Sequence, residues 1–250
     1  MPKLYPKPLL CHNEPVSWRN GCLYIDGAFQ LSEQSSHIYH ECLVSLPLCF
    51  VSEPKNVLIL GGGDGCSAYE ALKFPSVDQI VVVDYNPTMT RLASEHAKLL
   101  ELNHNSFADP KVIVIHTDAT DFVEKEPDNF WDCIILDFTA TDGNASIDSA
   151  LFHQGVERIL KQDGVWSRVM DFPWFVAARW SYKTPTRYFG VEYPGNGMGE
   201  TFLTAVRQTN PAAKNTNVMH KMRYLSVDKL AAFSSLPVLS PKEAYSRALL

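Results

Sequence analysis

Residues 57–65 read Val-Leu-Ile-Leu-Gly-Gly-Gly-Asp-Gly, an apolar run that passes directly into a glycine-dense turn containing one carboxylate. A second apolar run follows from Gln79 to Val83 and ends at Asp84. A glycine turn after a first strand lets a nucleoside approach the backbone. An acid about twenty residues on, at the end of the next strand, can accept hydrogen bonds from ribose hydroxyls. The pattern therefore predicts a nucleoside-binding α/β domain.

The glycine turn favours a cationic nucleoside over a dinucleotide. It departs from the G-x-G-x-x-G pattern and places Asp64 where a pyrophosphate would lie. A carboxylate repels phosphate and attracts positive charge, which suits S-adenosylmethionine and related sulfonium amines. An ordinary strand and turn with incidental acids is the alternative. Three consecutive glycines cost backbone entropy with no side-chain packing in return, which disfavours that alternative.

The remainder of the chain alternates between predicted strands and predicted helices. After the strand at 57–60, further strands are expected at 79–84, 111–116, 132–137 and 164–169. Helices are expected at 68–74, 87–100, 149–160 and 227–233, and an edge strand is expected at 202–206. This alternation predicts a doubly wound, mostly parallel sheet that is Rossmann-like and of the methyltransferase type.

The segment before this sheet predicts a small β structure. Cys22–Ile25 and Ala28–Leu31 flank Asp26-Gly27, a strong hairpin turn signal, and Ser36–Leu48 predicts a connecting helix. We therefore expect an N-terminal hairpin region with its helix at 1–50 and a catalytic nucleoside-binding domain at 51–250.

Acids stand at or just past the ends of several predicted strands: Asp64, Asp84, Asp118 and Asp137. In a parallel sheet these ends line one crevice. Each aspartate alone could be a helix N-cap, but four gathered carboxylates repel one another unless a cation joins them. Mg²⁺ usually arrives with phosphate, and no lysine or arginine occurs in these turns. We expect an organic cation and no metal.

Composition excludes several classes of protein. The 250 residues are 46% hydrophobic and 20% charged, enough for a full core, and 22 basic and 28 acidic residues give a net charge of −6. This balance argues against nucleic-acid binding. The sequence has neither a long apolar stretch nor a signal-peptide core at its beginning, so we expect a cytoplasmic protein that does not bind membranes. Six cysteines without a C-x-x-C pair predict reduced, mostly buried thiols.

Four segments together resemble the signature of spermidine synthases. They are Gly27–Glu33, Ile38–Glu41, the turn Gly61–Gly65 and Phe130–Asp137, which match in order and spacing from about residue 21 to 137. The similarity continues more loosely to Tyr193-Pro194. The resemblance implies a transferase of polyamine biosynthesis that moves an aminopropyl group from decarboxylated S-adenosylmethionine to an amine such as putrescine. Methylthioadenosine would be released, and the nucleoside would be a co-substrate rather than a cofactor.

The resemblance also implies roles for the donor-binding residues. Asp64 would hold the aminopropyl ammonium, in a turn where Gly61 and Gly63 approach the donor. Asp84 would bind the ribose in place of the family's usual glutamate. The remaining donor contacts would be Asp118 and Ala119 beside the adenine, and Gln30 and His40 along the donor site.

For the chemistry, the resemblance implies that Asp137 is the general base and that Tyr39 and Tyr193 position the attacking nitrogen. The family usually has a second acid after this strand that binds the acceptor, but here that position is Ala140. Either Asp142 takes over the acceptor contact, or the acceptor differs from putrescine. Because one hairpin is too small to stand alone, we expect a homodimer.

Two other functions fit the same sequence. An N-methyltransferase could use intact S-adenosylmethionine on this scaffold, but the donor carboxylate would then need a cationic or amide partner near Asp64. No obvious lysine or arginine lies in that turn. A catalytically silent binding protein is the second alternative, and the presence of Tyr39, Asp64, Asp137 and Tyr193 argues against it.

Overall fold

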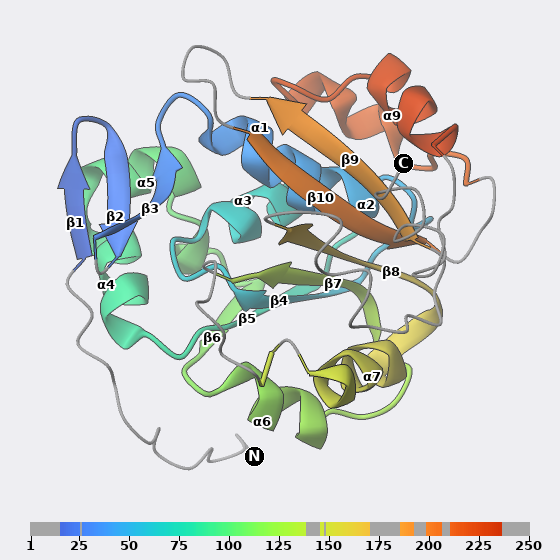
Figure 1. Cartoon of the computed structure of the whole chain (residues 1–250), viewed down its shortest axis with the longest axis horizontal. Helices are drawn as coiled ribbons and strands as arrows, with labels where there is room; N and C mark the ends of the chain where they lie inside the picture. The colour runs from blue at the N-terminus through green and yellow to red at the C-terminus, as the bar shows by residue number, and fades with distance from the viewer. Residues whose placement is uncertain are drawn as a thin grey trace, which may run out of the picture.

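The computed structural model describes residues 16–25, 27–138, 146–147, 149–170, 186–192, 199–206 and 211–236. These residues form a seven-stranded sheet between helices and a separate three-stranded sheet near the N-terminus (Figure 1). The strand order in the large sheet is β6-β5-β4-β7-β8-β10-β9. The mixed α/β fold with a mostly parallel sheet confirms the predicted fold class.

Five strands of the large sheet are parallel: β4 Asn56–Gly61, β5 Gln79–Val83, β6 Val112–Ile115, β7 Trp131–Asp137 and β8 Leu160–Met170. β10 (Gly199–Val206) runs antiparallel to β8, and β9 (Thr186–Glu192) runs antiparallel to β10. From β4 the chain builds outward through β5 and β6, then returns to add β7 on the other side. In open α/β sheets, ligands bind beside the carboxyl ends of the strands, at the point where the strand order reverses.

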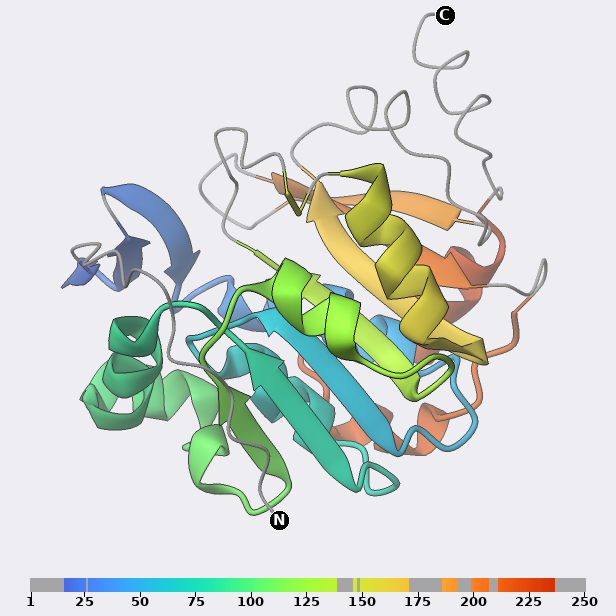
Figure 2. The same ribbon diagram turned by 90° about the horizontal axis from the view of Figure 1, so that it is seen from below.

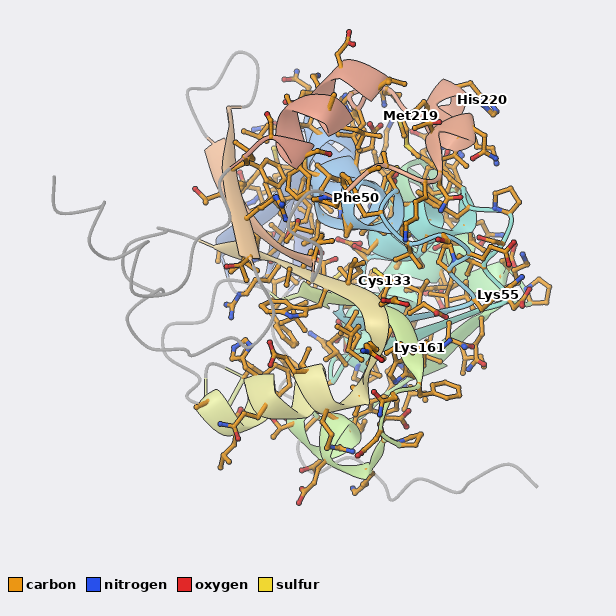
Figure 3. The ribbon with its side chains drawn as sticks, turned by 90° about the vertical axis from the view of Figure 1, so that its right-hand side faces the viewer. Phe50, Lys55, Cys133, Lys161, Met219 and His220 are labelled. Atoms are coloured by element: carbon orange, nitrogen blue, oxygen red, sulfur yellow. The ribbon has the colours of Figure 1, made fainter. Side chains whose placement is uncertain are left out.

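Helices cover both faces of the sheet because its central strands are apolar on both faces. One layer holds α1 (Ser36–His40), the π-helical segment η1 (Glu41–Ser45), α2 (Leu46–Leu48), α3 (Cys66–Leu72), η3 (Thr216–Lys221) and α9 (Val227–Ser234). The other layer holds α6 (Ala119–Lys125) and α7 (Ala150–Ile159), which lie across the strands in green and yellow in Figure 2. Cys133 of β7 lies between the two layers (Figure 3).

The N-terminal sheet is larger than the predicted hairpin. β2 (Cys22–Ile25) and β3 (Ala28–Ser32) pair as expected, and β1 (Val16–Arg19) adds a third antiparallel strand. Its residues Leu23 and Leu31 share a buried cluster with α4 (Pro87–Glu95) and α5 (Ala97–Asn103). This contact places β3 at the open end of the large sheet.

Three local predictions need correction. The single helix expected at 87–100 is two helices, because His96 has an extended backbone between them. Helix α6 and the short 3₁₀ turn η2 (Ser106–Ala108) had not been predicted. The strand expected at the edge, now β10, lies inside the sheet between β8 and β9, and β9 is the edge strand. Among the described helices, none has the length and apolar character required to cross a bilayer.

Candidate active site

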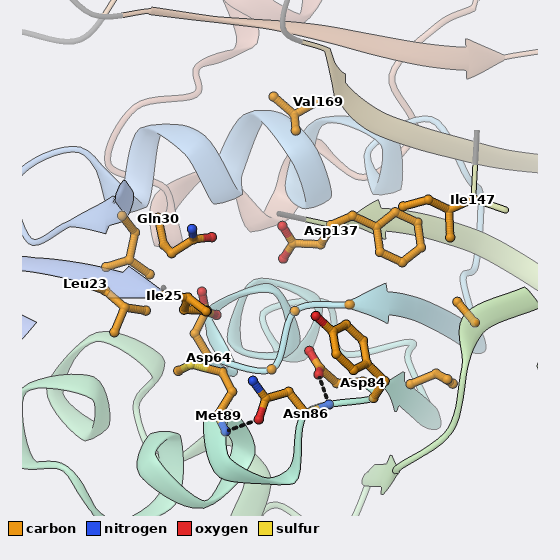
Figure 4. A pocket seen from close by; sticks show the side chains of 18 of the residues that line it. Leu23, Ile25, Gln30, Asp64, Asp84, Asn86, Met89, Asp137, Ile147 and Val169 are labelled. Carbon is orange, nitrogen blue, oxygen red and sulfur yellow. Dashed lines mark hydrogen bonds between the residues drawn. The ribbon is translucent and has the colours of Figure 1, made fainter. Parts of the chain in front are cut away.

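One crevice opens where β4, β5, β6 and β7 end, and residues of β3 and α1 also line it (Figure 4). The structure brings ten of the predicted site residues together along its wall: Gln30, Tyr39, His40, Gly61, Gly63, Asp64, Asp84, Asp118, Ala119 and Asp137. All four predicted acids therefore share a single crevice. Asp142 and Tyr193, and the altered position Ala140, lie outside the described residues.

The glycine turn closes the crevice around the strand ends. Gly61 has φ of +87°, and a Cβ there would lie 2.0 Å from the backbone oxygen of Asp137. The Gly62 N–H donates to that same oxygen at 2.9 Å. A Cβ on Gly63 would lie 2.5 Å from Oδ2 of Asp84. A side chain at Gly61 or Gly63 would therefore collide with Asp137 or Asp84. Because glycine has no side chain, the end of β4 can lie close to the acids at the ends of both neighbouring strands.

Asp137, at the end of β7, is held by two hydroxyl groups. The Tyr39 hydroxyl donates to Oδ1 at 3.0 Å, and the Ser67 hydroxyl donates to Oδ2 at 2.6 Å. Burial raises the pKa of Asp137, while the nearby His40 lowers it and Asp64 raises it further. A carboxylate with a raised pKa and a fixed orientation has the properties of a general base.

Asp64 and His40 face each other across a gap. The Cys66 N–H donates to Oδ1 of Asp64 at 2.8 Å, and Oδ2 lies 4.0 Å from Nε2 of His40. His40 Nδ1–H donates to the carbonyl of Ser36 at 2.7 Å, so Nε2 is the ring nitrogen that faces Asp64. Oδ2 of Asp64 therefore offers the kind of acceptor that a primary ammonium requires.

The same two side chains and the thiol of Cys66 are close enough to share a metal ion. Burial raises the pKa of the Cys66 thiol well above its usual value, and Asp64 raises it further. Metals bind the thiolate rather than the thiol. Cys66 is therefore a neutral thiol beside the Asp64 carboxylate.

Asp84 directly follows β5 and lines the crevice beside Gly63. Its Oδ1 accepts from the N–H of Asn86 at 2.7 Å. Burial raises the pKa of Asp84 to about 6, against the lowering effect of hydrogen bonds from the Asn86 and Gly63 N–H groups. The protonation of this carboxyl group therefore changes close to neutral pH.

Asp118 also caps a helix, which was the alternative considered for each strand-end aspartate. It is the N-cap of α6, and its Oδ1 accepts from the N–H groups of Thr120 at 2.7 Å and Asp121 at 3.3 Å. The residue is exposed and still lines the crevice beside the buried Ala119. The helix-cap alternative is therefore correct for this acid, and it does not remove Asp118 from the site.

Two functional candidates had not been found from the sequence. Ser67 lies in the first turn of α3, just after the glycine turn, where a short hydroxyl could have been noticed. Glu200 reaches the crevice from β10, and no local signal marks it. With Glu200, the described lining residues contain five carboxylates and neither lysine nor arginine. The crevice is therefore built for a ligand with positive charge.

Comparison with known proteins agrees with this geometry. Residues 36–182, more than half of the chain, match the model of the spermine/spermidine synthase domain. The chain belongs to this family. Spermidine synthase from Thermotoga maritima has the same fold, with a TM-score of 0.72 and 25% sequence identity over 86% of this chain and 77% of that one.

Two further relatives extend the comparison. A spermidine synthase structure in complex with the transition-state analogue AdoDATO gives a TM-score of 0.71 at 25% identity, covering 86% of this chain and 78% of that one. A polyamine aminopropyltransferase of Oceanobacillus iheyensis is 37% identical over 174 residues, 65% of this chain. The matched part spans 33% of that relative, so this chain covers about a third of its length.

Proposed function

We propose that this protein is an aminopropyltransferase that moves the aminopropyl group of decarboxylated S-adenosylmethionine to a small amine such as putrescine. The proposal rests on the hydrogen bonds and the surroundings of Asp137. Its carboxylate is fixed by Tyr39 and Ser67 in a crevice whose described lining has five acids and no basic residue except the histidine. Both substrates are cations, and one of them must lose a proton.

In the proposed reaction, the acceptor binds as an ammonium and gives one proton to Asp137. Its nitrogen then uses the freed lone pair to attack the methylene carbon beside the sulfonium. The carbon–sulfur bond breaks, its electron pair goes to sulfur, and neutral methylthioadenosine leaves. Proton acceptance by a positioned carboxylate and alignment of nitrogen, carbon and sulfur are the two sources of acceleration. Tyr39 and Tyr193 are proposed to position the nitrogen.

The proposed donor contacts follow the walls of the crevice. Asp64 and His40 would accept hydrogen bonds from the aminopropyl ammonium, and Asp84 would accept them from the ribose. The other donor contacts would be Gln30, Gly61, Gly63, Asp118 and Ala119. Intact S-adenosylmethionine carries a carboxylate as well, and the acidic described lining disfavours it. This supports the decarboxylated donor and argues against the N-methyltransferase alternative.

The defining experiment is incubation with each donor, decarboxylated or intact, and a panel of amines, followed by mass detection of products. We expect methylthioadenosine and an aminopropylated amine with the decarboxylated donor. Methyl transfer from the intact donor would instead support the methyltransferase. A protein that binds methylthioadenosine yet turns over neither donor would support the silent binding protein.

Replacing Asp84 with alanine should weaken binding of methylthioadenosine by about 2–4 kcal/mol, because two charge-assisted hydrogen bonds to the ribose are lost. The wild-type affinity should also depend on pH. The ionised carboxylate accepts these bonds, so affinity should be full above about pH 7 and fall as the pH drops through the Asp84 pKa of about 6. Calorimetric titration at several pH values measures both effects. An unchanged affinity in Asp84→Ala would show that another residue binds the ribose.

We also propose that the protein is a cytoplasmic homodimer. The cysteines in the described residues are free, as expected in a reducing compartment. The small sheet of β1, β2 and β3 is largely half-exposed, and a second subunit could cover it. Light scattering at micromolar concentration should give twice the mass of the chain. A monomer mass would exclude the dimer.

A further inference from the structure

The carboxylate of Glu41 is fully buried and is held by the backbone of a turn far along the chain. Oε1 accepts from the N–H of Arg223 at 2.7 Å, and Oε2 accepts from the N–H groups of Tyr224 and Leu225 at 2.8 Å each. These N–H groups lie between η3 and α9. Hydrogen bonds to a carboxylate are strong, and a buried charge without them is unfavourable. Glu41 therefore connects α1 firmly to the segment 211–236.

Glu41 directly follows two active-site residues of α1. The Tyr39 hydroxyl donates to Oδ1 of Asp137 at 3.0 Å. Nε2 of His40 lies 4.0 Å from Oδ2 of Asp64. At Glu41 the α-helix passes into the π-helical segment η1, a rare geometry that is frequent at functional sites. Bonds that fix the position of Glu41 therefore also fix the end of the helix that carries Tyr39 and His40.

A series of aromatic rings connects the same C-terminal segment to Tyr39 by a second route. Phe233 of α9 meets Phe189 of β9 edge-on, with 5.6 Å between ring centroids. Phe189 stacks on Phe202 of β10 at 5.4 Å, and Phe202 meets the Tyr39 ring edge-on at 5.6 Å. Such ring pairs attract one another beyond the area they bury. The segment 211–236 therefore restrains both the helix and the ring of Tyr39, although it lies outside the matched family domain at 36–182.

The position of α1 affects the ionisation of Asp137. The groups that act on this carboxyl group come from several elements: Tyr39 and His40 of α1, Ser67 of α3, Asp64 in the glycine turn and Asp84 after β5. Tyr39, His40 and Ser67 lower the pKa of Asp137, against burial and Asp64, which raise it. Two of the three lowering groups are on α1. A displacement of α1 would therefore raise the pKa of Asp137 as well as move the groups around the reacting nitrogen.

We infer that Glu41 is a positioning residue: by binding the backbone at 223–225 it fixes α1, and with it the orientation of Tyr39 and His40. The C-terminal segment then forms part of the active-site framework, although none of its described residues lines the crevice. This inference rests on the proposed function, because the oriented groups are those of the proposed transfer.

Glu41→Gln keeps the shape of the side chain and removes its charge. The kcat for transfer to putrescine should fall about 10- to 100-fold, since a displacement of about 1 Å can have such an effect. Methylthioadenosine lacks the ammonium that His40 and Asp64 would hold, so its affinity should stay near the wild-type value. The acid limb of the pH–rate profile should move to higher pH, because Asp137 loses part of the Tyr39 hydrogen bond that keeps it ionised.

Tyr39→Phe and the double variant complete a double-mutant cycle. If Glu41 acts through α1, the losses in kcat from Glu41→Gln and Tyr39→Phe should be less than additive, because each disturbs the same contact with Asp137. Glu41→Asp keeps the charge and should recover part of kcat. Additive losses, together with an acid limb at the wild-type pH in Glu41→Gln, would overturn the inference and leave Glu41 with a purely structural role.

Two control variants separate positioning from charge and from stability. Glu53→Gln makes the same change at an exposed position before β4. Val156→Ala removes buried methyl groups from α7, on the other face of the sheet, and lowers stability without contact with α1. Both controls should keep the wild-type acid limb. A shift of the limb in Val156→Ala equal to that in Glu41→Gln would mean that loss of stability alone causes it.

Hydrogen exchange in the wild type tests the same connection if Glu41→Gln does not fold. Methylthioadenosine and putrescine added together should slow exchange of the amides at 223–225, because a filled crevice restrains α1. Unchanged exchange there, with slower exchange at the glycine turn, would overturn the inference. Absence of aminopropyl transfer by wild type with every amine would instead refute the proposed function, and the exchange experiment would still test whether the 223–225 turn is coupled to the crevice.

Discussion

Asp137→Asn should lower kcat for aminopropyl transfer by about 10²- to 10⁴-fold, the usual contribution of a general base. The amide keeps the shape of the side chain but cannot accept the ammonium proton. Donor affinity should change little, because the proposed donor contacts lie on Asp64 and Asp84. Single-turnover rates with saturating donor and amine measure the chemical step directly.

The pH dependence of the transfer rate tests the role of the Asp137 carboxyl group independently. Burial raises the pKa of Asp137, so the wild-type rate should fall on the acid side at a pH above the ordinary aspartate range. The rate should rise toward mildly alkaline pH as more amine is neutral. Asp78→Asn, the same change at an exposed surface position, is the control. Near-normal turnover in Asp137→Asn with any amine would refute the mechanism.

Gly61→Ala should destabilise the protein by about 4 kcal/mol, the sum of left-handed backbone strain and overpacking. At φ of +87° an alanine is strained, and its Cβ would lie 2.0 Å from the backbone oxygen of Asp137. The neighbouring atom is backbone at the end of a buried strand and cannot turn away. Urea unfolding followed by circular dichroism gives the free energy of unfolding.

Gly27→Ala distinguishes the cost of backbone strain from the cost of overpacking. Gly27 has a similar φ of +78°, but a Cβ there meets no atom within 4 Å. Its cost should therefore be the strain alone, about 1–2 kcal/mol. Equal losses in the two variants would mean that the contact with Asp137 is relieved by a small backbone shift. The Gly61 variant should also weaken methylthioadenosine binding, since Gly61 and Gly63 are themselves proposed donor contacts in the displaced turn.

Local patterns in the sequence were sufficient for the parallel strands of the central sheet and for four of the five acids that line the crevice. The apolar runs of β4, β5 and β7 are continuous because these strands are buried on both faces, and such runs are visible without any partner. Strand-end acids and the rule that parallel strand ends share one edge then placed Asp64, Asp84 and Asp137 in one crevice. Helix α6 was missed although its N-cap, Asp118, had been noted as a possible helix cap.

The tertiary structure alone decided how these groups act on one another. Tyr39 and Ser67 are 98 and 70 residues from Asp137 in the sequence, and they meet it only because α1 and α3 pack against the end of β7. The position of β10 inside the sheet, which brings Glu200 to the crevice, depends on pairing with β8 and β9. The sequence by itself determined which residues carry charge and which strands they end. Strand pairing and helix packing are long-range contacts, and they determined the hydrogen bonds, the burial and the raised pKa of Asp137 and Asp84.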